Sequence, residues 1–108
     1  MVRLHWEFEW DEKKAASNFK KHGISFDVAA EVLQDPDGDR FHFDRDDPGH
    51  SELENRYITT GSHPDARSLV LVVSWTDRGT DVERVTRIIS ARKATKREII
   101  DYGQAIGG

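Results

Sequence analysis

The stretch RVTRIISARKATKREIIDY, from Arg84 to Tyr102, decides the fold of this chain. Its first half carries apolar and polar residues on both sides of an extended backbone, which predicts a β-strand. In a regular strand, residues 85, 87, 89 and 91 share one side, and residues 84, 86, 88 and 90 share the other. Its second half contains TKRE at residues 95–98, which matches a capping box and predicts a helix from Thr95. We expect Ile99, Ile100 and Tyr102 to reach the core.

The same stretch concentrates positive charge in a chain whose net charge is −4. Six cations come before the first carboxylate, Glu98: Arg84, Arg87, Arg92, Lys93, Lys96 and Arg97. Such a patch indicates a surface that binds a phosphate backbone, and a solvated strand edge with a first helical turn is the alternative. Two of the cations lie in the first helical turn, where the helix dipole disfavours them. An anion bound at that helix end would offset this cost.

Composition limits the classes of protein to consider. The 108 residues are 36% hydrophobic and 33% charged, which fits one soluble globular domain over residues 1–108. The chain has no apolar run long enough to cross a membrane and no signal-peptide pattern, so we expect it to act in the cytoplasm. The absence of cysteine excludes disulfides, thiolate zinc sites and cysteine nucleophiles.

Before this stretch, two helices and several strands are predicted. Alternation over residues 4–10 is typical of a half-buried strand. A helix follows over residues 11–22, begun by Asp11 and ended by Gly23, with residues 15, 16 and 19 as its inward stripe. Ser25 is expected to cap a second helix that ends at Pro36.

The middle of the chain changes character. Residues 35–54 carry eight Asp or Glu and two Arg, a net charge of −6, and predict a long acidic loop with a short strand at residues 41–43. Strands follow over residues 56–61 and 68–75, with turns at residues 62–65 and 76–79, and residues 69–73 form the central strand. The predicted fold class is α+β, with two N-terminal helices and a C-terminal helix packed on a mostly antiparallel β-sheet.

The acidic segment DPDGD, at residues 35–39, is the clearest candidate for a metal site. An EF-hand loop would need Gly at its sixth position and Glu at its twelfth, but Arg40 and Asp46 stand there. The pairs His42 with Asp44 and His50 with Glu54 have no known ligand spacing. We therefore expect no metal and no cofactor, and an acidic turn-rich loop instead.

Several polar residues at helix and strand ends could act together on a phosphate. Arginine can hold a phosphate through two hydrogen bonds and stabilise the charge of a pentavalent transition state. A His or Lys could move the protons, and the 2′-hydroxyl of RNA could attack the adjacent phosphate. Singly, each has a simpler explanation, such as a helix C-terminal charge for His22. The set is Lys20, Lys21, His22, His50, Glu54, Arg56, Arg87 and Arg92.

Motifs along nearly the whole chain resemble the BrnT family, the toxin half of a bacterial type II toxin–antitoxin pair. They are FEWD (residues 8–11) with Lys14 and Asn18, KHGISF (21–26) with Ala29 or Ala30, HS (50–51) with Glu54 and Arg56, and RIISARKATKRE (87–98) with Tyr102. The chain departs from the pattern at Thr59-Thr60, where an apolar residue is more usual, and at Gly103, which is expected to interrupt the last helix.

The resemblance implies a RelE-like fold, RNA cleavage that halts translation, possible action on the ribosome, and a BrnA-like ribbon-helix-helix antitoxin through which operator DNA is bound. It implies catalytic candidates Lys21, His22, Arg56, Arg87 and Arg92. Further RNA contacts are expected from Trp10, Lys20, Lys93, Lys96 and Arg97.

A regular strand would put Arg87 and Arg92 on opposite faces, so a shared site requires a bend or the end of the strand near Ala91. A non-catalytic module that binds RNA or an antitoxin, and a metal hydrolase that uses the acidic loop, remain the alternatives.

Overall fold

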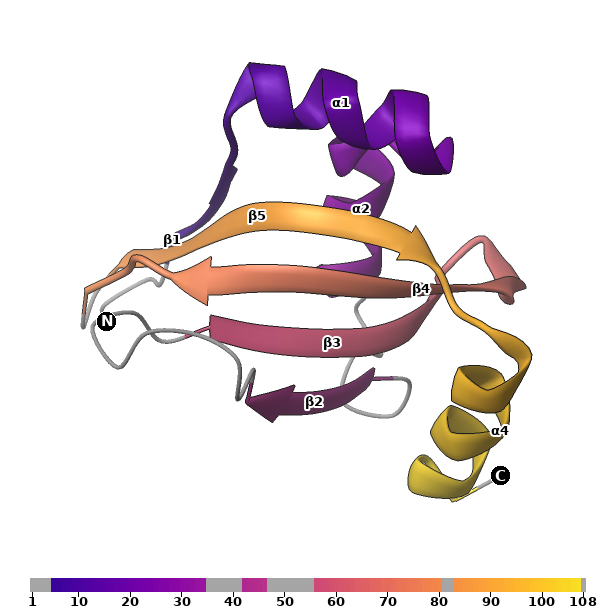
Figure 1. Ribbon diagram of the computed structural model, residues 1–108. Helices are drawn as coiled ribbons and strands as arrows, with labels where there is room; N and C mark the ends of the chain where they lie inside the picture. The colour runs from indigo at the N-terminus through magenta and orange to yellow at the C-terminus, as the bar shows by residue number, and fades with distance from the viewer. Residues whose placement is uncertain (1–4, 35–41, 47–55, 81–82, 108) are drawn as a thin grey trace.

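A computed structural model describes residues 5–34, 42–46, 56–80 and 83–107, which form a five-stranded sheet with three helices (Figure 1). The strand order is β1-β5-β4-β3-β2; β1 is parallel to β5, and the other pairs are antiparallel. None of the helices in these ranges is long and apolar enough to cross a membrane. The elements are β1 (His5–Glu9), α1 (Glu12–His22), α2 (Phe26–Leu33), β2 (His42–Asp46), β3 (Arg56–His63), β4 (Ala66–Asp77), β5 (Glu83–Lys93) and α4 (Lys96–Ala105).

The two N-terminal helices begin and end as their sequence predicts. Asp11 accepts hydrogen bonds from the backbone N–H groups of residues 13 and 14, and Gly23 ends α1 in the left-handed conformation at φ 71°. Ser25 caps α2 by accepting from Val28. The predicted inward stripe of α1 is wrong in part, because Phe19 is 58% exposed and Ala16 is also exposed. The buried residue of α1 is Asn18.

The core lies between α2 and one face of the sheet. Helix α2 contributes Phe26, Ala29, Val32 and Leu33, which pack on Leu71, Val73, Ile88 and Ala91 of the two central strands. Figure 1 shows α2 behind the sheet and α1 along its β5 side, while α4 contacts β2 and β3. Strand β4 has buried residues on both faces from Val70 to Val73, so the prediction of a central strand is confirmed.

The edge strand β2 extends the sheet beyond β3. A short strand was expected at residues 41–43, and the observed strand is longer and pairs with residues 57–61 of β3. The rest of the predicted acidic loop, and Pro36, lie outside the described residues. Thr59 occupies a buried position where an apolar residue was expected. Its hydroxyl accepts a hydrogen bond from Trp75 Nε1 at 2.8 Å and donates one to Asp44, so both of its hydrogen-bonding roles are satisfied.

Helix α4 begins with the predicted capping box. Thr95 accepts from the Glu98 N–H, and the Glu98 carboxylate accepts from the Thr95 N–H. Tyr102 is buried and its hydroxyl lies 3.2 Å from Ser62 Oγ of β3. The expectation that Ile99 and Ile100 reach the core is wrong, because both are exposed. Gly103 does not interrupt the helix, which continues to Ala105.

A β-bulge in β5 changes which residues share a face. Ser90 pairs with Ser74 of β4, but Ile88 pairs with the next β4 residue, Trp75, so Ile89 has no partner in the register with β4. Ile88 and Ala91 therefore both face the core. The strict alternation predicted for β5 is wrong beyond Ile88, and Arg87, Ser90 and Arg92 pair with the alternate β4 residues 76, 74 and 72 on the opposite face.

The side chain of Asn18 joins α1 to the edge of β5. Strand β1 pairs with β5 only as far as Glu9 opposite Arg87, so the edge of β5 beyond that point has no strand partner in the described register. Asn18 accepts from the Ala91 N–H at 3.1 Å and donates to the Ala91 carbonyl at 2.8 Å and to the Ile24 carbonyl at 3.0 Å. One buried amide thus replaces a neighbouring strand.

We expect Asn18→Ala to lower the free energy of unfolding by about 2–4 kcal/mol, because it leaves the buried N–H of Ala91 and two carbonyls without partners. Urea denaturation at neutral pH measures this loss. Ser17→Ala, at the exposed neighbouring position, is the control and should change stability by less than about 0.5 kcal/mol. Equal stability of the two variants would contradict the role given to Asn18.

Candidate functional site

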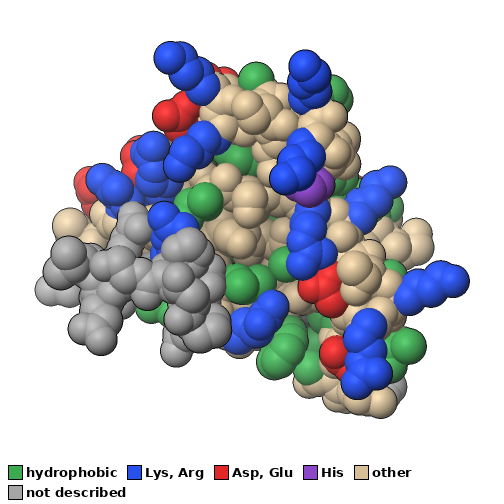
Figure 2. Space-filling view, in the orientation of Figure 1, with side chains coloured by type: hydrophobic (Ala, Val, Ile, Leu, Met, Phe, Trp, Pro, Cys, Tyr) green, Lys and Arg blue, Asp and Glu red, His purple; other side chains and the backbone are tan. Residues whose placement is uncertain are grey.

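The face of the sheet turned away from α2, here called the front face, carries three predicted arginines. Arg56 of β3 and Arg87 of β5 both pair with Thr76 of β4, so their Cα atoms lie two strand spacings apart, about 10 Å. Arg92 pairs with Val72, four residues along β4, about 13 Å from that row. Figure 2 shows Lys and Arg side chains spread over this face from α1 to α4, with a histidine among them.

A basic hollow of about 330 Å³ lies between α1 and β5. Lys21 and His22, two of the catalytic candidates, line it from the last turn of α1. Ile89 and Ser90 line it from β5, so the hollow lies beside the part of β5 between Arg87 and Arg92. Its other lining residues are Lys13, Lys14, Ser17 and Asn18. Two of the five catalytic candidates thus line the hollow. Arg87 and Arg92 lie on β5 on either side of Ile89 and Ser90, and Arg56 lies across β4 from Arg87.

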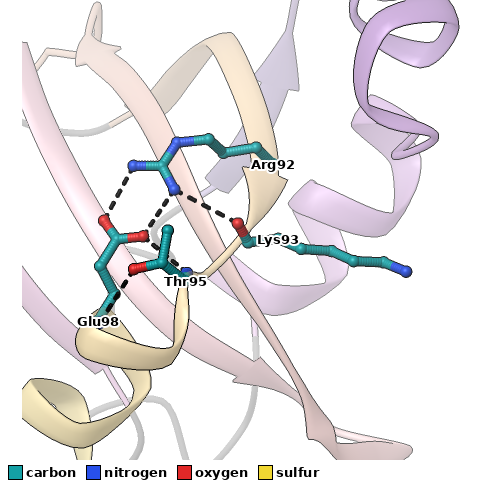
Figure 3. A network of polar contacts seen from close by, with 4 residues as sticks. All are labelled: Arg92, Lys93, Thr95 and Glu98. Carbon is teal, nitrogen blue, oxygen red and sulfur yellow. Dashed lines mark hydrogen bonds and ion pairs between the residues drawn. The ribbon is translucent and has the colours of Figure 1, made fainter.

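Arg92 is held firmly by Glu98 (Figure 3). Its two terminal nitrogens donate to the two carboxylate oxygens at 2.7 and 2.9 Å, a bidentate arrangement. Glu98 also accepts from the Thr95 N–H, and Arg92 donates to the Lys93 carbonyl at 3.3 Å. The hydrogen bond from Arg92 lowers the pKa of Glu98 to about 2, and the same bond raises the pKa of Arg92. The start of α4, where the sequence suggested a bound anion, is therefore occupied by the carboxylate of Glu98.

Arg87 is held more loosely than Arg92. Its Nη1 lies 3.6 Å from Glu9 Oε1, beyond hydrogen-bonding distance, and Arg78 Nε lies at the same distance from the same oxygen. Two guanidinium groups therefore share one half-exposed carboxylate. A phosphate can compete for Arg87 more easily than for Arg92, because less of the Arg87 interaction would be lost.

The predicted RNA contacts outside this region are spread over the molecule. Trp10 packs edge-to-face on Phe26, with ring centroids 6.0 Å apart, and lines a groove between α1 and α2 that shares no residue with the basic hollow. Lys20 is exposed and lines neither. Lys93 ends β5, and Lys96 and Arg97 begin α4, where Arg97 pairs with Asp101 at 3.3 Å. Contact of any of these with RNA remains a prediction.

Sequence reasoning missed several residues of the front face and the hollow. Lys13, Ser17, Ile89 and Ser90 line the hollow, and none of them was a candidate from the sequence. Thr76 is 1% exposed, and its hydroxyl has no hydrogen-bond partner among the described residues, although it lies between Arg56 and Arg87 in the register. A buried hydroxyl without a partner is uncommon in folded proteins.

No three His, Asp or Glu side chains in the described ranges lie close enough to hold a metal ion. His50, Glu54 and the acidic segment at residues 35–39 lie outside those ranges. The described part therefore offers cations, hydroxyls and an imidazole for chemistry on a phosphate.

The chain was compared with known proteins. The model of one family, described as "Ribonuclease toxin, BrnT, of type II toxin-antitoxin system", matches residues 10–98. No curated protein matches the chain. The matched range includes α1, the bulge of β5 and all three arginines of the front face.

We expect Glu98→Gln to lower the free energy of unfolding at pH 7 by about 1–2 kcal/mol. This is less than for a buried ion pair, because the Arg92 side chain is 40% exposed and solvent screens the interaction. The folded-state pKa of Glu98, about 2, is below the ordinary 4.5, so this stability is present above pH 4.5 and is lost as the pH falls towards 2. Urea denaturation of both proteins from pH 7 to pH 2 measures it. A difference in unfolding free energy between the two proteins that stays constant with pH would contradict this assignment. Asp101→Asn, which breaks an exposed ion pair, should change the free energy of unfolding little.

We expect Thr76→Val to raise the free energy of unfolding by up to about 1 kcal/mol, because valine has the same shape and removes a buried hydroxyl that has no partner. The matched control is Thr59→Val, which leaves Trp75 Nε1 without its acceptor and should destabilise the protein. Thermal and urea unfolding compare the two. A similar loss of stability in both variants would mean that Thr76 has a partner.

Proposed function

Since this chain belongs to the BrnT family of ribonuclease toxins from type II toxin–antitoxin systems, we propose that it is an endoribonuclease that cleaves RNA and inhibits translation. It acts in the cytoplasm as one RelE-like toxin domain, without a metal ion. A protein antitoxin neutralises it, as the type II class implies. That antitoxin is a BrnA-like ribbon-helix-helix protein, which provides the contact with operator DNA.

The observation that carries this proposal is the common face of the arginines. The bulge at Ile89 lets Arg87 and Arg92 point to the side of the sheet that Arg56 shares through its pairing with Thr76. Lys21 and His22 line the hollow beside the same part of β5. Several guanidinium groups beside an imidazole and an ammonium group are suited to bind a phosphodiester and move protons next to it.

The proposed reaction uses the nucleophile that RNA itself contains. The 2′-oxygen attacks the adjacent phosphorus, the bond from phosphorus to the 5′-oxygen breaks, and the products are a 2′,3′-cyclic phosphate and a 5′-hydroxyl. His22 or Lys21 removes the proton from the 2′-hydroxyl, and the other donates a proton to the leaving 5′-oxygen. Arg56 and Arg87 stabilise the negative charge of the transition state.

The ion pairs of the arginines suggest different roles for two of them. Among the described residues, Arg87 pairs with a single carboxylate, 3.6 Å away, that it shares with Arg78, so it can turn to the scissile phosphate. Arg92 is bound bidentately by Glu98, and breaking these hydrogen bonds to bind a phosphate would cost free energy. Arg92 therefore acts as a fixed positive charge at the margin of the site. Loss of Arg87 should therefore impair catalysis, whereas loss of Arg92 should impair both catalysis and folding.

We expect Arg87→Ala to abolish growth arrest on expression without an antitoxin and to reduce kcat/KM on RNA by about 10²–10³-fold, because a cation that stabilises the transition state is lost. Growth curves and cleavage of a labelled oligoribonucleotide measure this. Arg67→Ala, which removes an exposed arginine in the β3–β4 hairpin, is the control and should stay toxic. A folded, well-expressed Arg87→Ala protein that remains fully toxic would remove Arg87 from the mechanism.

The same cleavage assay separates the alternative functions. Cleavage that persists in chelator and leaves cyclic phosphate ends supports the proposed mechanism. Binding without cleavage, on free RNA and on translating ribosomes, would identify a non-catalytic module. Loss of cleavage in chelator would favour a metal hydrolase instead.

A further inference from the structure

The basic hollow contains more binding groups than the proposed cleavage step requires. Lys21 and His22 lie at one end of its α1 wall, in the last turn of the helix. Lys13 and Lys14 lie about two turns away along the same wall, about 10 Å by helix geometry. The wall thus has cations at both ends, and only one end serves the reaction.

The hollow is held in shape by hydrogen bonds to its floor. Lys14, Ser17 and Lys21 follow the three- and four-residue spacing that puts side chains on one face of a helix. Asn18, on that face, is bound to Ala91 through both its amide nitrogen and its oxygen. This helix face is therefore fixed against β5 before any ligand arrives, which lowers the entropic cost of binding.

The three lysines of the hollow lack counter-charges. In the described part of the chain, none of Lys13, Lys14 and Lys21 makes an ion pair within 4.0 Å, whereas the arginines at positions 78, 87, 92 and 97 each do. Two of the lysines lie in the first turn of α1, where the helix dipole disfavours positive charge. Helix stability does not account for them, and a bound anion would relieve their repulsion.

The rest of the lining matches the other parts of a nucleotide. The bulge places Ile89 in the hollow, where its half-buried side chain offers an apolar surface for a base or ribose. Ser17 and Ser90 supply hydroxyls that can donate or accept hydrogen bonds. A volume of about 330 Å³ is at the small end of ligand pockets, large enough for one nucleotide and too small for a duplex.

We propose that this hollow is a subsite for single-stranded RNA, in which Lys13 and Lys14 bind the phosphate next to the scissile one and Ile89 supports its nucleoside. This rests on the proposed function, because Lys21 and His22 join the subsite to the reacting phosphate. The subsite lengthens the RNA footprint along α1, and it selects strands whose bases are unpaired.

The test compares substrates with one phosphate and with several. A dinucleoside monophosphate has only the scissile phosphate, whereas a hexanucleotide also fills the subsite. We expect Lys13→Ala/Lys14→Ala to reduce kcat/KM roughly tenfold on the hexanucleotide and to leave the dinucleotide unchanged. Ser17→Leu, which fills the hollow without changing charge, should reduce kcat/KM more on the hexanucleotide than on the dinucleotide. Equal losses on both substrates, or no loss on either, would overturn the subsite.

Binding measured without cleavage separates failure of the subsite from failure of the proposed function. The probe is a fluorescent hexanucleotide with 2′-deoxyribose at every position, which cannot be cut by the proposed route. We expect Lys14→Ala to weaken its binding and to reduce the slope of log affinity against log salt by about 0.7, while Arg67→Ala, with the same loss of charge, has little effect. If the wild-type protein binds this probe through Lys14 but cleaves no RNA, the subsite stands and the ribonuclease falls.

Three further results would count against the subsite. An effect of Arg67→Ala equal to that of Lys14→Ala would mean that affinity for the probe depends on total charge and not on a defined site. Weakened binding of the antitoxin by Lys14→Ala, with RNA affinity unchanged, would assign the hollow to the protein partner. Displacement of the probe by an equal concentration of duplex RNA would show that unpaired bases are not required.

Discussion

The hydrogen bonds between the Asn18 amide and the backbone of Ala91 hold α1 against β5, and the basic hollow lies between these two elements. They close the edge of β5 where β1 has stopped, and they fix the C-terminal half of α1 beside that edge. A buried backbone N–H or carbonyl without a partner costs free energy comparable to a lost hydrogen bond. This side chain therefore helps to fix where α1 lies, and with it the positions of Lys21 and His22.

The bulge at Ile89 is the second constraint, and it acts on the same stretch of β5. Without an extra residue, Arg87 and Arg92 would project from opposite faces, one of them into the core beside Ile88 and Ala91. The bulge keeps both apolar residues in the core and both arginines out of it. It also turns Ile89 towards α1, where it lines the hollow. One inserted residue thus keeps the apolar residues of β5 and its arginines on separate faces.

The protein balances its exposed arginines with its own carboxylates. Glu98 neutralises Arg92 and caps α4, while Glu9 lies between Arg78 and Arg87. These carboxylates limit the repulsion between the arginines. The difference in geometry means that a phosphate could bind Arg87 more readily than Arg92. The lysines of the hollow have no such carboxylates in the described part of the chain. Among the described residues, positive charge without a paired carboxylate is therefore found where the RNA subsite is proposed.

Local patterns in the sequence were enough to determine the helices, their caps, the central strand and the arginine-rich stretch, because each depends on residues close together in the chain. The capping box at Thr95 and the left-handed Gly23 formed as predicted. The sequence also identified the family, since its motifs span most of the chain.

The sequence could not show that Asn18 rather than Phe19 is buried, because that depends on a partner 73 residues away. Nor could it show that Ile89 is bulged, since register is set by pairing with β4. The tertiary structure alone decided which side chains line the hollow together, because contacts between distant segments determine side-chain direction.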